Sequence, residues 1–183
     1  MGDHAGDVFR IKYITEGSEK LPFLMQNENG PCPLLAITNI LLLKRKIRIH
    51  PDLAFIDFRY LIQLVGNFLV ESNPPHPNPE MQSNQQQQIA DALAVLPKLG
   101  RGLDVNVKFQ KVTDFEYTDE MSVLDMLGIN LVHGWLCDPQ DTACASVIQD
   151  KSYNQLICML VDADAAHSTP PPQPSGDAPT PSP

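Results

Sequence analysis

Cys32 is the side chain of this sequence whose setting best suits covalent chemistry. It follows the polar loop 26–31 and precedes Pro33. Proline favours the first position of a helix, where its missing N–H would be unpaired anyway, so Cys32 is expected at the helix N-cap. Unpaired N–H groups and the helix dipole favour negative charge there. We therefore expect a lowered thiol pKa and a thiolate that can act as a nucleophile.

Acyl transfer by a cysteine also needs hydrogen-bond donors for the oxyanion that develops on the carbonyl oxygen. The backbone N–H of Cys32 is one candidate, and the side-chain amide of Gln26, six residues earlier, is another. Asn27 and Asn29 are alternatives. An amide donor, a loop and a cysteine on a buried helix form the arrangement of papain-type proteases. The competing interpretation, a small buried residue at a helix start, is evenly matched with the catalytic one on these grounds.

A cysteine nucleophile needs a base, which is normally a histidine. His133 is the best placed of the five histidines because it lies in the apolar stretch 131–136, although a structural role is favoured for it. It is therefore a weak base candidate. The remaining histidines are expected at the N-terminus, in loops or in the tail: His4, His50, His76 and His167.

Helices and short strands must position these residues. The run 34–43 after Cys32 is apolar nearly all round, which is typical of a helix buried in the middle of a domain. Helical spacing and capping signals predict further helices at 57–70, 85–96, 122–127 and 152–159. Strands are expected at 7–14 and 103–112, a short apolar stretch at 21–25, a loop at 73–79, and a strand or loop at 131–136. The mixture predicts an α+β fold, papain-like in logic, with a buried central helix.

The composition limits the classes of function. The chain has 183 residues and a formal net charge of -9, so nucleic acid is not an expected partner. No apolar run is long enough for a membrane span and no secretory signal is present, which favours an intracellular location, cytoplasmic or nuclear. The four cysteines form no C-x-x-C pair, so free thiols are expected and a zinc site is not.

The C-terminal segment differs in composition from the rest. From Asp162 onward Ala, Ser, Thr and Pro dominate, and seven of the 17 prolines lie in 170–183. Such a segment cannot bury enough apolar surface to offset the entropy of ordering it. We expect 162–183 to be a disordered tail.

The string Gln26-Asn-Glu-Asn-Gly-Pro-Cys32-Pro-Leu-Leu-Ala-Ile closely resembles the active-site motif of the MINDY family of cysteine deubiquitinases. Supporting matches lie at 121–127, 133–136, 138–140 and 152–156, and the resemblance covers about 9–160. It implies that Cys32 is the nucleophile, that Gln26 shapes the oxyanion hole, and that no metal or cofactor is used. It also implies polyubiquitin as the partner, joined through the lysine linkage that marks proteins for the proteasome.

The family's catalytic histidine belongs to a strand well beyond the element at 152–156. This sequence departs from the family after about residue 160, so we expect 7–161 to be a partial, C-terminally truncated catalytic domain without that histidine. Whether the chain is an enzyme is left open, and any activity is expected to be impaired or lost. The alternatives are a non-catalytic module that binds ubiquitin or another protein, and an unstable product with no function of its own.

Overall fold

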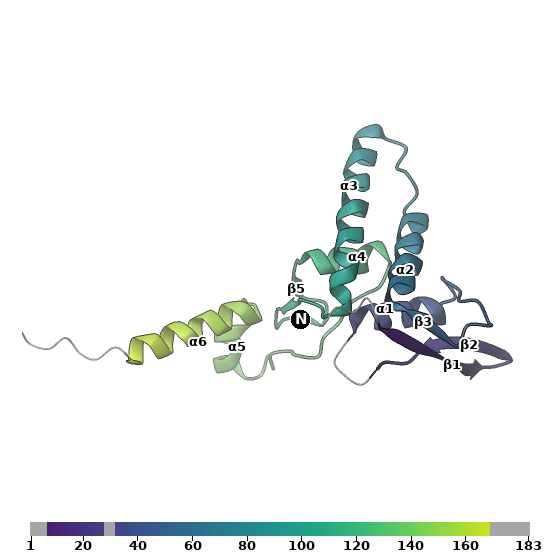
Figure 1. The fold of residues 1–183 in the computed structure, drawn as a ribbon. Coiled ribbons are helices and arrows are strands. Elements are labelled where there is room, and N and C mark those ends of the chain that lie inside the picture. The colour runs from purple at the N-terminus through teal and green to yellow at the C-terminus, as the bar shows by residue number, and fades with distance from the viewer. Residues whose placement is uncertain (1–6, 28–31, 169–183) are drawn as a thin grey trace, which may run out of the picture.

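Residues 7–27 and 32–168 are described by the computed structural model; residues 1–6, 28–31 and 169–183 are not. A β-hairpin, a pair of long helices that rise together, and a further pair of helices on the side opposite the hairpin project from a common centre (Figure 1). Helices and antiparallel strands occupy different stretches of the chain, which confirms the predicted α+β class.

The main sheet is antiparallel and has the strand order β2-β1-β3. Strands β1 (Val8–Glu16) and β2 (Glu19–Leu24) form a hairpin, and β3 (Phe55–Asp57) pairs with the start of β1. The turn between β1 and β2 has two residues, and Gly17 at its first position has φ +61°. A positive φ at this position suits the right-handed twist of the flanking strands, and glycine adopts it without a Cβ clash.

The predicted central helix is α1 (Pro33–Leu43), and its N-cap is Cys32 as expected. The helix packs against β2, against α2 (Phe58–Ser72) and against the 3-10 helix η2 (Leu96–Gly100). Burial on these three sides explains why apolar residues surround most of the helix axis. The buried residues of α1 are Leu34, Leu35, Ile37, Thr38, Asn39, Leu41 and Leu42.

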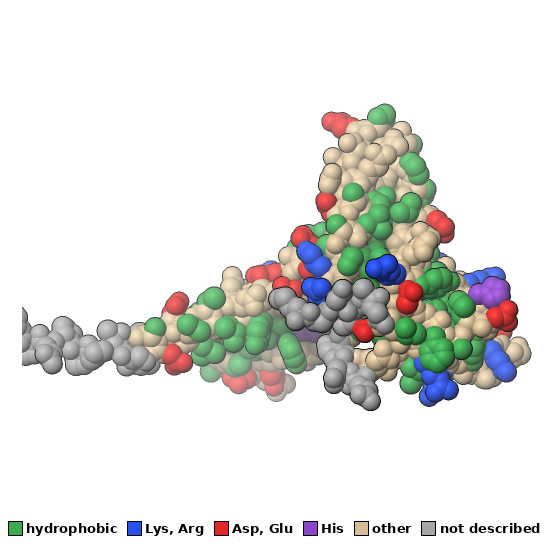
Figure 2. Space-filling view, viewed as in Figure 1, with side chains coloured by type: hydrophobic (Ala, Val, Ile, Leu, Met, Phe, Trp, Pro, Cys, Tyr) green, Lys and Arg blue, Asp and Glu red, His purple; other side chains and the backbone are tan. Residues whose placement is uncertain are grey.

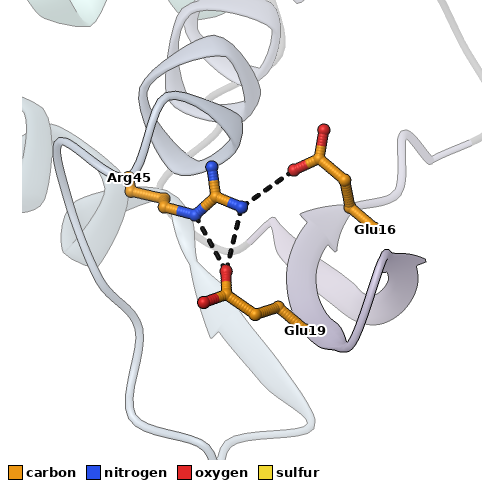
Figure 3. A network of polar contacts seen from close by, with 3 residues as sticks. All are labelled: Glu16, Glu19 and Arg45. Carbon is orange, nitrogen blue, oxygen red and sulfur yellow. Dashed lines mark hydrogen bonds and ion pairs between the residues drawn. The ribbon is translucent and has the colours of Figure 1, made fainter.

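Helix α1 ends where the chain adopts a left-handed conformation at Arg45, whose φ is 57°. A non-glycine residue is strained there. The Arg45 guanidinium reaches back to the hairpin turn, where it lies 2.9 Å from both Glu16 and Glu19 (Figure 3). All three side chains are more than half exposed, so this network adds little stability by itself, but it joins the end of α1 to the tip of the hairpin.

The paired helices that rise from the centre are α2 and α3 (Pro79–Val95). Asp57 caps α2 by accepting a 2.7 Å hydrogen bond from the backbone N–H of Tyr60. Leu61, Val65 and Leu69 are fully buried at helical spacing, as the sequence pattern predicts. Helix α3 begins six residues before its predicted start at 85, because Asn78 caps the N–H groups of the first turn.

The remaining elements are short or exposed. Helix α4 (Asp119–Met126) packs against α3, and β4 (Asn106–Val107) pairs with β5 (Phe115–Glu116). The arm opposite the hairpin consists of α5 (Thr142–Ile148) and α6 (Tyr153–Ser168).

Several sequence expectations need correction here. The predicted strand 103–112 is ordered as a strand at 106–107 alone, because its later groups bond to unrelated segments: Lys108 N–H to Asp114, Cys137 N–H to Phe109 and His133 N–H to Val112. The expected end of the last helix near 159 is also wrong, since α6 continues to Ser168, into the range predicted to be tail. The rest of that range lies outside the described residues. Strands β3 and β5 and helix α5 were not predicted.

Candidate active site

A groove of about 910 Å³ opens beside the N-terminus of α1. Its walls are the end of β2 with the two residues that follow, one face of α1, Leu103, Leu124 of α4 and the segment 129–131. Most of the lining is apolar. Among the described residues, the polar side chains on its wall are Gln26, Cys32, Asn39 and Asn130. An apolar cleft with few convergent polar groups is the usual form of a binding site.

The groove follows one stripe of α1. Cys32, Ala36, Asn39 and Leu43 all line it, at spacings of four, three and four residues, which is the repeat that places side chains on one helix face. Ala36 is exposed although its neighbours in the helix are buried. The prediction of a buried helix is therefore confirmed for most of α1, and the exception is the face that floors the groove.

Cys32 is half-buried at the N-terminal end of this stripe, with the extended backbone (φ −114°, ψ 93°) of a helix N-cap. Its carbonyl accepts the 3.2 Å hydrogen bond from Ala36 N–H that opens the helix. Its sulfur makes no capping hydrogen bond of normal geometry. The thiol therefore faces the groove from the place the sequence assigned to it.

The pKa of the Cys32 thiol is shifted in the direction opposite to the one expected from the sequence. Burial raises the pKa of Cys32 above its ordinary value, and the Asp7 carboxylate adds to the rise, whereas the backbone amides of Leu35 and Leu34 lower it. The helix N-terminus thus favours the thiolate, as expected, but desolvation outweighs it. Burial therefore opposes formation of the Cys32 thiolate in this structure.

Gln26 lines the same groove, two residues after the end of β2, and is exposed. Its neighbour Asn27 donates a 3.1 Å hydrogen bond from its side chain to the carbonyl of Val8, which ties this short segment to β1. The structure therefore brings Gln26 and Cys32 to one groove from different elements. Asn29, an alternative donor, lies outside the described residues.

His133 is placed elsewhere. Its ring meets that of Phe115 edge-on, with the ring centres 5.0 Å apart, and its Nδ1 accepts a hydrogen bond of 3.3 Å from the backbone N–H of Trp135. It does not line the groove. In the part of the chain that the structure describes, His50 and His76 lie in loops, where each accepts a hydrogen bond from a backbone N–H two residues on. Among these residues no histidine stands beside Cys32.

Asn39 is a groove residue that sequence reasoning missed. It is buried on α1, and its side chain both accepts from Leu24 N–H (2.8 Å) and donates to Leu24 C=O (3.0 Å). A polar residue in the middle of an otherwise apolar helix was the available signal, because a buried amide requires partners. The identity of those partners, on a strand 15 residues earlier, could not be derived from local pattern.

No three His, Cys, Asp or Glu side chains in 7–27 and 32–168 gather closely enough to hold a metal ion. Within the same ranges, no helix combines the length and apolar character needed to cross a membrane.

A half-buried thiol at the start of a central helix, in an apolar groove that a glutamine also lines, is the kind of site found in cysteine hydrolases. The sequence model of the MINDY deubiquitinase family matches residues 7–178. The chain belongs to this family.

The chain is also similar to individual members of the family. The chain is 47% identical over 155 residues to rat "Ubiquitin carboxyl-terminal hydrolase MINDY-1", a match that covers 85% of this chain and 32% of the relative. It is 44% identical over 163 residues to human MINDY-1, covering 89% of this chain and 35% of that protein. It is 42% identical over 162 residues to bovine MINDY-2, covering 88% and 26%. The chain thus spans about a third of MINDY-1 and a quarter of MINDY-2.

Proposed function

We propose that this chain carries the nucleophile half of a cysteine-type deubiquitinase site. Cys32 would attack the carbonyl of the isopeptide bond between the C-terminal glycine of ubiquitin and a substrate lysine, and Gln26 would donate to the oxyanion. The observation that carries the proposal is the shared groove: a thiol and an amide donor face one apolar channel from α1 and from the end of β2. The names of the relatives, ubiquitin carboxyl-terminal hydrolases, support ubiquitin as the acyl group that passes to Cys32, with the lysine amine as the leaving group.

The finer part of the proposal concerns the linkage and the rate. Resemblance to the family favours polyubiquitin joined through the proteasome-targeting linkage, acted on in the cytoplasm or nucleus. We expect turnover by this chain to be low, for two reasons. Burial keeps the Cys32 pKa raised, and no histidine among the described residues lies in the groove to take its proton. Loss of the base from such a dyad costs orders of magnitude in rate.

The decisive experiment is the reaction of the chain with ubiquitin that carries a C-terminal electrophile. We expect covalent labelling of the wild-type chain and none of Cys32→Ala. Cys158→Ser, which removes an exposed thiol on α6, is the matched control and should label as the wild type does. His133→Ala should also label normally, because His133 packs on Phe115 and not in the groove.

A cleavage assay on chains of the proteasome-targeting linkage then tests turnover, and little or none is expected. Rapid cleavage that depends on Cys32 would show that a base is present and would contradict the low-turnover part of the proposal. A folded wild-type chain that stays unlabelled would contradict the nucleophile itself. If that unlabelled chain still bound ubiquitin, the non-catalytic binding module would be the correct function, since the apolar groove can hold a peptide without reacting with it.

A further inference from the structure

The segment that carries Gln26 is attached at three points. The backbone N–H of Met25 donates to Arg10 C=O (2.9 Å), and the side chain of Asn27 donates to Val8 C=O (3.1 Å). Both of these bonds tie the segment to β1. The third attachment is the pair of hydrogen bonds between Asn39 and the backbone of Leu24. Among the hydrogen bonds of the described residues, this pair is what connects the segment to α1, the helix that begins at Cys32.

Asn39 forms hydrogen bonds with the free edge of β2, as the backbone of a neighbouring strand would. Leu24 ends β2 at the edge of the sheet, and its N–H and C=O both point toward α1 rather than toward β1. The side-chain amide of Asn39 offers one acceptor and one donor, which is the complement of a backbone peptide group. The amide therefore pairs with the strand edge and fixes its distance from the helix axis.

Asn39 lies on the same face of α1 as the nucleophile Cys32. Asn39 lies seven residues after Cys32, two helical turns along the stripe that floors the groove. Gln26 lies two residues after Leu24 and lines the same groove. Cys32 and Gln26 are thus connected through two turns of α1, the Asn39–Leu24 hydrogen bonds and one further residue of chain.

We propose that Asn39 is the positioning residue that sets Gln26 at its distance from Cys32. This inference rests on the proposed function for its catalytic meaning, because Gln26 matters to chemistry only if Cys32 reacts. Asn39 itself touches no substrate. It acts by holding the end of β2 against α1, so that the Gln26 amide is already in place when an oxyanion forms. Preorganised donors are effective because no reorganisation is required during the reaction.

The chain provides a matched control in Thr38, the neighbouring buried polar residue on α1. Thr38 donates a 2.7 Å hydrogen bond to the carbonyl of Leu34, one turn earlier in the same helix, and does not line the groove. Thr38→Val and Asn39→Leu each remove a buried polar group from α1 in favour of an apolar one of similar size. Asn39→Leu alone removes a link to β2.

The first measurement is hydrogen exchange at the backbone amides of residues 24–27. Asn39→Leu should accelerate exchange of Leu24 N–H and its followers, whereas Thr38→Val should leave them protected. Asn39→Ala also removes both partners of Leu24 and adds no bulk to the core, so it should accelerate exchange too if Asn39→Leu does not fold. Unchanged exchange in the folded variants would overturn the proposal whether or not the chain is an enzyme.

The second measurement is the affinity for ubiquitin with a C-terminal aldehyde. The thiol adds to this carbonyl: the S–C bond forms, the C=O π bond breaks, and the oxygen becomes an oxyanion that takes up the thiol proton. Loss of an oxyanion donor costs about a hundredfold in known hydrolases, so a displaced Gln26 should cost about tenfold or more in affinity. We expect this loss in Asn39→Leu and not in Thr38→Val. Alkylation by iodoacetamide, which forms no oxyanion, should proceed at the wild-type rate in both.

A double-mutant cycle separates positioning from general destabilisation. If Asn39 acts through Gln26, adding Asn39→Leu to Gln26→Ala should not weaken aldehyde binding further. Additive losses, or an equal loss in Thr38→Val, would overturn the proposal. A wild-type chain that does not bind the aldehyde at all would contradict the proposed function instead, and the exchange measurement would still decide whether Asn39 holds the strand.

Discussion

The N-terminal body (residues 7–27 and 32–141) and the C-terminal arm (residues 142–168, with α5 and α6) of this chain both contain many apolar residues but are packed in opposite ways. The body holds one continuous apolar cluster that runs from Phe9 to Ile129. Among the described residues of the arm, Ala145 and Ser152 are the buried ones. Large apolar side chains are exposed along α6 instead, and Figure 2 shows them gathered over the arm: Tyr153, Ile157, Met159, Leu160 and Val161.

The contrast between the body and the arm shows that a helix can form without being buried. Helix α6 begins with Ser152 and Gln155, which cap each other's backbone N–H groups, so local signals are enough to start it. This capping starts the helix but does not require that the apolar side chains of α6 be buried. Helix α1 has both the local start signal at Pro33 and neighbours on three sides.

The candidate site lies in the body. Cys32, Gln26 and Asn39 all line its groove, and Asn39 is held there by its two hydrogen bonds to Leu24. His133, the weak base candidate, lies outside the groove, where its ring contacts Phe115 and its Nδ1 accepts from the backbone N–H of Trp135. The structure therefore brings the thiol and the glutamine to one groove and leaves this histidine outside it.

The largest expected effect comes from matched leucine truncations in the two regions. Leu41 on α1 is 1% exposed and Leu160 on α6 is 63% exposed. Leu41→Ala should lower the free energy of unfolding by about 2–5 kcal/mol, because it removes buried methyl groups and leaves a cavity. Leu160→Ala should change it by less than about 0.5 kcal/mol, as surface substitutions do. Urea denaturation followed by circular dichroism measures both, and equal losses would refute the contrast between the regions.

A smaller effect should follow when the attachment of the arm is cut. Asn106 is buried in the body, where it donates to Glu116 and to Ser152 Oγ (3.1 Å) and accepts from the backbone N–H of Asn154 (3.0 Å). Asn106→Ala leaves these groups without their partner, which should cost about 1–3 kcal/mol. The loss should be local: amide exchange in α6 accelerates while α1 stays protected.

Gln110→Ala is the control for this second experiment. Its side chain also links the body to the arm, through a 2.8 Å hydrogen bond to Asp150, but both residues are exposed there. Water replaces an exposed partner, so exchange in α6 should stay near the wild-type rate. If Asn106→Ala unfolded α1 and α6 together, the two regions would form one cooperative unit and the comparison would fail.

The predictions from sequence succeeded where the deciding interactions are local. Pro33 and the apolar run after it predicted α1 and the N-cap position of Cys32, and both are confirmed. They failed where the deciding interaction is distant. The direction of the Cys32 pKa shift depends on burial and on Asp7, which is 25 residues earlier, and strand β3 exists because it pairs with β1.

The same distinction between local and distant interactions applies to α6, Asn39 and the groove. Helix α6 continues beyond its expected end because alanine itself favours helix, whereas prolines dominate only the residues that follow. The partner of Asn39 could not be derived from local pattern, because Leu24 is on another element. Gln26 is expected from the sequence as an amide donor for Cys32, but the groove that both residues line also depends on elements far along the chain.

The smallest expected effect concerns the thiols of the two regions. Cys32 in the body is half-buried and Cys158 in the arm is exposed. Iodoacetamide at pH 8 should therefore modify Cys158 first. Asp7→Asn should speed modification of Cys32 slightly, because the Asp7 carboxylate makes the smallest contribution to its raised pKa, and should leave Cys158 unchanged. Mass spectrometry of the modified peptides measures both rates. Equal acceleration at the two cysteines would mean that the substitution loosens the fold instead.

The raised pKa of Cys32 also links the body's stability to pH. Above the ordinary thiol pKa of 9.0 the unfolded chain loses the Cys32 proton while the folded chain still holds it. The unfolded state then binds fewer protons, so the free energy of unfolding should fall as pH rises from that value toward the raised one, and should be insensitive to this group below it. Cys32→Ser, whose hydroxyl does not ionise in this range, should flatten that part of the profile. Cys158→Ser should leave it as it is, because α6 and its exposed thiol are solvated whether the body is folded or not.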